Sequence, residues 1–410
     1  MNTQRSVPAL WILAAPVLTF GMMGGFIVVT LPQILAAQGI PGGHIAVDVA
    51  IITSPGFWIF LLAPFLDVRF RRRTYALFFC VLAVVATAFT VLHHSSEFEV
   101  EAVMLLGFIS LALFGAAQGG WTGSLIKKEQ DSRLGAWSTV CNIGGGGIGI
   151  LLSGFVTQHL SPDRAAAFIF IAFLAPLAVF PLIPAPPPDG TLAGESFVRF
   201  TREVASLLKR REVLVALTMF ALPSASFALT NVLGGIGEAF HASPSLVSIF
   251  GGTGSILAGI AGSAMVPLMA KKFPLRPLYL VIGLVGAGFT LSLLLMPLAP
   301  WTYGLAFLGE NIFQAAAFAT GFAIIYEVIG PGNPLAATIF ALLSASMNFP
   351  IIYMEVIDGH GYDWHGVAGA FLADALVSGG VCVLLWFVLF RVLRVQKLRV
   401  PPEPQPEEAG

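Results

Sequence analysis

The stretch Pro64-Phe-Leu-Asp-Val-Arg-Phe-Arg-Arg-Arg-Thr-Tyr-Ala-Leu77 places four arginines between two long apolar segments. The arrangement recurs along the chain, where twelve apolar segments alternate with short connections. Twenty of the 21 Lys and Arg residues lie at the chain ends or in every second connection, and Arg164 is the exception. Because positive charge resists translocation, we expect the basic side, with both chain ends, to be cytoplasmic.

Most of these segments have the roughly 17–25 residues that a helix needs to cross about 30 Å of hydrocarbon. The sequence therefore predicts an all-α, multi-pass membrane protein with twelve transmembrane helices in two six-helix bundles. We expect it in a bacterial cytoplasmic (inner) membrane. The predicted segments are 8–37, 45–66, 74–92, 102–126, 134–158, 165–184, 213–236, 245–269, 277–297, 302–328, 336–357 and 367–390.

Composition excludes several other classes of protein. The chain is 57% apolar and only 10% charged, whereas soluble domains carry about 25% charged residues. A net charge of −1 provides no basic field for nucleic acid. Cys80, Cys141 and Cys382 lie in separate apolar segments without metal-ligand spacing, so we expect three buried thiols and no disulfide or metal. No phosphate-binding loop is present, and no cofactor is predicted.

The chain divides into two halves. The opening stretch aligns with Pro267-Leu-Met-Ala-Lys-Lys-Phe-Pro-Leu-Arg-Pro-Leu-Tyr-Leu280, which follows the second segment of the second half. Parallel halves of this kind place a substrate site between them, near the membrane midplane. The predicted domains are a bundle at 1–184, a cytoplasmic linker with an amphipathic helix at 185–212, a bundle at 213–392 and a disordered tail at 393–410.

At this point the sequence resembles the major facilitator superfamily. The loop after the second helix of that family carries an Asp-Arg-x-Gly-Arg-Arg pattern, and here it reads Asp67-Val-Arg69-Phe70-Arg71-Arg72. The resemblance implies a gate in which Asp67, Arg69, Arg71 and Arg72 tie helix ends together in one transport state. Simple positive-inside charge is the alternative.

Four stretches resemble a narrower branch that contains muropeptide permeases (AmpG-like), acetyl-CoA transporters and siderophore importers. They are Leu62–Asp67, Gly251–Gly262, Gly309–Phe313 and Phe340–Ser346. One stretch departs from the branch: Gln118-Gly-Gly-Trp-Thr-Gly123 stands where muropeptide permeases carry aspartates. A siderophore or another organic molecule is therefore as good a substrate prediction as a muropeptide.

Two acids lie at membrane depth, where ionisable residues are costly and often functional. Glu310 lies about 12 Å into its helix at 1.5 Å per residue, and Asp374 lies at a similar depth. No Lys or Arg lies at that depth to neutralise them. Because a carboxyl buried without a partner favours its protonated form, both are candidates for proton coupling. The alternative is a permanently protonated group that bonds a neighbouring backbone.

Polar and aromatic residues within the segments are candidates for a substrate cavity, although buried amides also bond neighbouring helices. Trp58 and Tyr326 are further candidates for aromatic walls. Asp48, Glu327 and Glu355 are expected near helix ends. The run Gly144-Gly-Gly-Gly147 is expected to let helices approach closely. The cavity candidates are Gln33, Gln118, Trp121, Asn142, Asn231, Asn311, Gln314 and Asn348.

The predicted function is secondary active transport, with proton-coupled import of an organic solute by alternating access. A proton-coupled exporter is the main rival. A membrane-embedded enzyme is disfavoured because the seven histidines lie on the side opposite the basic loops, without metalloenzyme spacing. A non-transporting membrane sensor is a third class. The predicted partners are the lipid bilayer, a small organic solute and protons, and we expect a monomer.

Overall fold

Within the residues that the computed structural model describes, all regular structure is helical. Nine helices there are long and apolar enough to cross a membrane. The all-helical membrane fold is thus confirmed, whereas the count of twelve crossings and the side on which the termini lie stay predictions. Most of the predicted linker, with its amphipathic helix, and most of the predicted tail fall outside the described ranges. Those ranges are 8–40, 42–67, 70–93, 96–184, 205–233 and 235–397.

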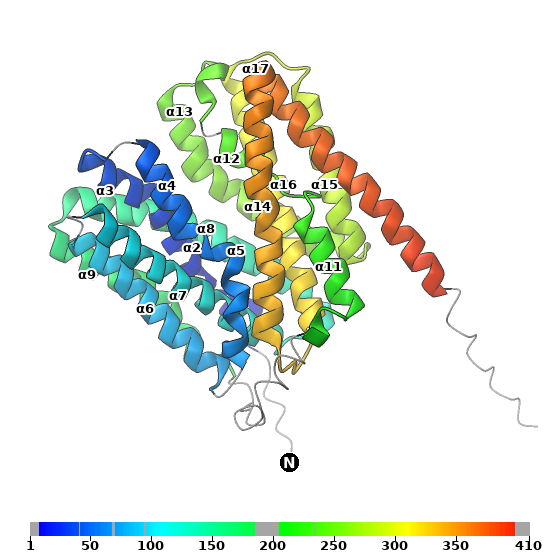
Figure 1. Cartoon of the computed structure of the whole chain (residues 1–410), viewed down its shortest axis with the longest axis horizontal. Helices are drawn as coiled ribbons and strands as arrows, with labels where there is room; N and C mark the ends of the chain where they lie inside the picture. The colour runs from blue at the N-terminus through cyan, green and yellow to red at the C-terminus, as the bar shows by residue number, and fades with distance from the viewer. Residues whose placement is uncertain are drawn as a thin grey trace, which may run out of the picture.

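The first half is a group of long helices interrupted by short irregular turns. Figure 1 shows this half in blue to cyan, beside the green-to-red second half. Its elements are α1 (Leu10–Ala14), α2 (Val17–Gly25), the π-helical η1 (Phe26–Thr30), α3 (Leu31–Ala37), α4 (Gly42–Thr53), α5 (Pro55–Trp58), η2 (Ile59–Leu61), η3 (Ala63–Asp67), α6 (Arg72–Leu92), α7 (Glu97–Gly123), η4 (Lys128–Gln130), α8 (Asp131–His159), α9 (Pro162–Leu174) and η5 (Ala175–Leu182).

The second half contains several short helical pieces and the longest of the described helices. It begins with two short pieces and ends with α17, which folds back on itself at one end of the molecule (Figure 1). Its elements are α11 (Arg211–Ala221), α12 (Leu229–Leu233), η6 (Gly237–Phe240), α13 (Pro244–Ile249), the π-helical η7 (Phe250–Gly254), α14 (Ser255–Met269), α15 (Leu275–Leu293), α16 (Pro300–Ile329) and α17 (Ala336–Lys397).

Two predicted segments are not single helices. The segment predicted at 45–66 is divided at Pro55 into α4 and α5, followed by two 3-10 turns, because proline cannot donate the next helical hydrogen bond. The segment predicted at 213–236 is interrupted after Ala221, before Pro223. Its backbone resumes a helix only after Phe227, which has a φ of 48°. A positive φ is uncommon for a residue with a side chain, and it shows that the helix is interrupted here.

The last two predicted helices are joined more closely than expected. The prediction ends one at 357 and starts the next at 367, but the first arm of α17 continues to a kink at His365 and Gly366. Gly366 has a φ of 60°, which glycine adopts at no steric cost. Asp358 therefore lies inside a helix and not in a loop.

Glycines set the close contact between α2 and α8. A side chain on Gly145 would collide with the backbone of Leu18, and one on Gly149 with that of Met22. Gly144 has nothing within 4 Å of an added Cβ. Part of the predicted glycine run therefore supports close helix packing, as the small-residue pattern indicates.

Candidate functional site

A cavity of about 670 Å³ lies between the two halves. Its first-half wall comes from α2, η1, α4, α5, η2, α7 and α8, and its second-half wall from α12, α16 and α17. Small-molecule sites in proteins span about 300–1,000 Å³. The cavity therefore has the size and position expected for a solute site between two bundles.

Aromatic side chains dominate the cavity wall, four from each half. Such rings offer large apolar surfaces and negatively polarised faces. The first half contributes Phe20, Phe57, Phe108 and Phe114, and the second half contributes Phe318, Phe322, Tyr326 and Phe340.

Four of the predicted polar residues also line the cavity: Gln118, Asn142, Asn231 and Asn348. The Gln118 amide donates to the Leu13 carbonyl at 2.9 Å, and the Asn348 amide donates to the Ser344 carbonyl at 2.9 Å. These bonds fix the orientation of two side-chain amides at the cavity surface.

The other four predicted cavity residues are not part of this wall. Gln33 is exposed in the first turn of α3. Trp121 is buried, and its indole donates to the Pro184 carbonyl at 2.9 Å. Asn311 donates to the Phe307 carbonyl, and Gln314 donates to the Thr230 hydroxyl at 2.8 Å. The polar groups of these three side chains therefore bond other parts of the protein, as buried polar groups in membrane helices often do.

Glu355 lines the cavity although its predicted place is near a helix end. It lies within α17 because the first arm of that helix extends past it to the kink at His365. Its Oε1 accepts a hydrogen bond of 2.5 Å from the Asn231 amide of α12. A cavity carboxylate is thus held by a side chain from the neighbouring broken helix.

A cluster of three buried acids lies behind this wall, within the second half. Glu310 of α16 is fully buried, and its Oε1 accepts a 2.5 Å hydrogen bond from Thr290 of α15. Its Oε2 has no hydrogen-bond partner among the described residues. Asp374, from the second arm of α17, is also buried and has one unpartnered oxygen. The two predicted coupling residues are therefore brought together within one bundle.

Asp358 is the third acid, and the sequence prediction missed it. It is fully buried, and neither of its carboxylate oxygens has a partner in the described part of the chain. Its charge interacts with those of Asp374 and Glu310, and with that of Glu355 one helical turn away. The signal that identifies it is the spacing of three residues from Glu355, which places both acids on one side of a helix.

At one end of the molecule, a buried ion pair of the first half contacts the second half. The Arg72 Nε lies 2.8 Å from Asp67 Oδ1. Arg72 also donates across the interface to the carbonyls of Asn333 and Pro334, at 3.0 and 2.6 Å. Because Arg72, Lys128 and Arg276 all lie here, we call this the basic end.

Asp67 caps a helix of the opposite half. Its two carboxylate oxygens accept hydrogen bonds from the backbone nitrogens of Ala337 and Thr338, at 3.1 and 2.9 Å, and from the Thr338 hydroxyl at 2.7 Å. These nitrogens belong to the first turn of α17, where an anion is favoured by free N–H groups and the helix dipole. Of the other predicted gate residues, Arg71 is exposed, and Arg69 lies outside the described residues.

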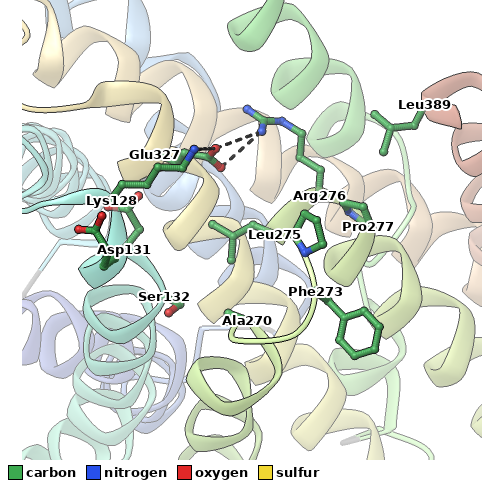
Figure 2. Close-up of a pocket in the computed structure, with 12 residues that line it drawn as sticks. Lys128, Asp131, Ser132, Ala270, Phe273, Leu275, Arg276, Pro277, Glu327 and Leu389 are labelled. Carbon is green, nitrogen blue, oxygen red and sulfur yellow. Dashed lines mark hydrogen bonds and ion pairs between the residues drawn. The ribbon is translucent and has the colours of Figure 1, made fainter. Parts of the chain in front are cut away.

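A second ionic contact spans the halves at the basic end. Glu327 of α16 lies 3.4 Å from Arg276 in its own half and 3.6 Å from Lys128 of the first half. Figure 2 shows Lys128 and Arg276 approaching Glu327 from opposite sides of a crevice whose wall includes the buried Asp131. Lys128 is 79% exposed, so this pair is worth less than the buried Asp67–Arg72 pair.

Close backbone packing completes the closure. A Cβ on Gly120 of α7 would lie 2.5 Å from the Ala337 nitrogen of α17. The Gly332 N–H donates to the Ser124 carbonyl at 3.2 Å, and the Ser138 and Tyr326 hydroxyls share a hydrogen bond of 2.9 Å. At the opposite end of the cavity, by contrast, Val28 is 61% exposed and Asn231 is exposed.

Comparison with known proteins gives one family and one fold. The family model described as Major Facilitator Superfamily matches residues 17–308. No curated protein matches the sequence significantly. The structure is similar to that of the human organic anion transporter MFSD10 (TETRAN), with a TM-score of 0.68, 17% identity, and coverage of 93% of this chain and 98% of that one.

Two bacterial transporters have similar folds. The Escherichia coli fucose:proton symporter FucP has a TM-score of 0.67 at 14% identity, covering 92% of this chain and 98% of its own. A bacterial homologue of the iron transporter ferroportin, in an outward-facing state, has a TM-score of 0.64 at 11% identity, with the same two coverages, 92% and 98%. At these identities the likeness concerns the fold.

Proposed function

Because the chain belongs to the Major Facilitator Superfamily and is a transporter and not an enzyme, we propose that it imports a small organic solute together with protons. The neighbours named above are an organic anion transporter, a fucose:proton symporter and a homologue of an iron transporter, so the shared fold does not decide the solute. The muropeptide, acetyl-CoA and siderophore branch stays a prediction, as does the bacterial inner membrane.

Alternating access is supported by the asymmetry of the cavity. Its basic end is closed by the hydrogen bonds of Asp67 and Arg72 to the second half, whereas its other end reaches exposed residues. Since the basic end is predicted to be cytoplasmic, this arrangement corresponds to an outward-facing state. The inward-facing state then requires the contacts between Asp67 and the first turn of α17 to break, and those contacts act as a gate in the proposed cycle.

Proton coupling is carried by one observation, the burial of Glu310 with an unpartnered Oε2 beside two further acids. Three carboxylates cannot all be ionised so close together without strong repulsion, so the cluster holds protons in this state. We propose that Glu355 and Asp358 connect the cavity to Asp374 and Glu310, because Asp358 interacts with the charges of the other three acids. Protons enter by this route from the outer side and leave when the basic end opens.

The test is Glu310→Gln, which keeps the Thr290 contact but cannot exchange a proton. In proteoliposomes with an imposed proton gradient, accumulation of solute is expected to stop, while exchange of solute at equal pH continues. Glu238→Gln makes the same chemical change at an exposed position of the second half and is expected to behave as wild type. Unchanged accumulation by Glu310→Gln would remove this residue from the mechanism.

A further inference from the structure

The described charged groups of the cavity wall are of one sign only, which is negative. Among the described residues that line it there is no Lys, Arg or His, and Glu355 is the single acidic residue. An anion placed there meets no compensating charge, and a buried charge without a partner is expensive. A cation can approach a carboxylate instead.

Glu355 is arranged to receive such a group. The Asn231 amide occupies its Oε1, at 2.5 Å, while its Oε2 accepts no hydrogen bond from the described residues. The carboxylate is half-buried, so one oxygen remains available to a ligand in the cavity. A cation in the cavity would be attracted to the charge of this oxygen, and one that carries an N–H donor would also form a charge-assisted hydrogen bond with it.

The remaining wall suits the rest of such a ligand. Rings from both halves, among them Phe57, Phe318 and Phe322, surround the cavity. Aromatic faces attract organic cations within about 6 Å and provide apolar contact for bulky groups. The amides of Asn142 and Asn348 supply further hydrogen-bonding groups at the same surface.

We propose that the cavity selects organic cations with aromatic or other apolar bulk, with the positive charge at Glu355 and the apolar part against the rings. The inference rests on the proposed function, because it takes this cavity as the solute site. It defines the class of solute by charge, which the family does not.

Two probes of nearly the same shape and opposite charge test the proposal, tetraphenylphosphonium and tetraphenylborate. Binding of each is measured separately to the full-length protein in phosphatidylcholine nanodiscs, with empty nanodiscs subtracted to remove partitioning into lipid. The wild-type protein is expected to bind the phosphonium about tenfold or more tightly than the borate, because only the cation gains from the carboxylate. Equal or tighter binding of the borate overturns the proposal.

Variants assign the preference to the cavity. Glu355→Gln is expected to weaken phosphonium binding about tenfold and to leave borate binding unchanged or improved. Glu238→Gln, an exposed acid outside the cavity, is the matched control. If Glu355→Gln does not fold, Asn348→Lys places a cation in the same wall and is expected to reverse the preference. A preference that survives these changes overturns the proposal.

The outcome is separable from that of the transport account. Binding is measured without a proton gradient, so it reports the charge preference of the cavity separately from coupling. Loss of charge preference would leave proton-coupled transport standing. Failure of coupling in Glu310→Gln proteoliposomes would leave the charge preference standing.

Discussion

The contact most open to a quantitative test is the one between Asp67 and the start of α17. Asp67 is buried, and it accepts one hydrogen bond from Arg72 and three from Ala337 and Thr338 of the opposite half. The substitution Asp67→Asn keeps the shape of the side chain but removes its charge and one of its acceptor oxygens. Arg72 then lies beside a neutral amide in place of a carboxylate.

The expected cost follows from the buried setting. Breaking a buried ion pair by removing one partner costs about 3–5 kcal/mol. We take about 3 kcal/mol, because the asparagine oxygen still accepts a hydrogen bond and Arg72 keeps its contacts to the Asn333 and Pro334 carbonyls. If closure of the basic end against α17 is what buries Asp67 and Arg72, this cost applies to the closed state alone, and the ratio of closed to open molecules falls about a hundredfold.

The assay is a distance measurement between spin labels placed on Lys127→Cys and Lys272→Cys. Both positions are exposed at the basic end and lie in different halves, whereas the three native cysteines are buried. The distance distribution of Asp67→Asn is expected to gain a longer component. Asp163→Asn makes the same change at an exposed position and is the control. An unchanged distribution in a folded Asp67→Asn protein would refute the reasoning.

Further predictions concern the same interface and the acid cluster. Gly120→Val is expected to hold the basic end open, because the valine side chain would collide with the Ala337 backbone. The distance between the same two spin labels measures this, and Gly144→Ala is the control because its Cβ meets nothing within 4 Å. Tyr326→Phe removes the hydrogen bond between the Tyr326 and Ser138 hydroxyls, which is expected to destabilise the closed state by about 1 kcal/mol. The same label pair should then show a roughly fivefold shift toward the open basic end, and an unchanged distance distribution would contradict this. Asp358→Asn is expected to reduce proton-driven accumulation as Glu310→Gln does, and wild-type accumulation by this variant would exclude it from the proton route.

Much of the fold follows from local sequence properties. The length of the apolar segments and the distribution of Lys and Arg predict a helical, membrane-spanning chain. In a bilayer the backbone N–H and C=O groups must be hydrogen-bonded within the protein, and a helix does this within one segment. What these sequence properties do not predict is where a helix breaks. The break before Phe227 and the kink at His365 and Gly366 depend on tertiary packing, and hydropathy passes over both.

The residues of the site are harder to predict from sequence, because their contacts also depend on tertiary packing. A polar residue inside a membrane must find a partner, but the sequence does not show whether that partner is a ligand or another helix. Asn142 faces the cavity, whereas Gln314 bonds Thr230. Asp358 was missed because the predicted helix ended one residue before it. Asp67 could be assigned to a gate by resemblance, but its specific partner, the first turn of α17, required the structure.

In the proposed cycle solute and proton enter together, and their joint entry can be measured in one experiment. Candidate solutes, namely a muropeptide, ferric siderophores, coenzyme A thioesters and aromatic organic cations, are added to proteoliposomes that hold a trapped pH-sensitive dye. The account predicts that a transported solute accumulates with simultaneous acidification of the interior, and that a protonophore or Glu310→Gln abolishes the accumulation. Accumulation of a solute with no change of internal pH would contradict it.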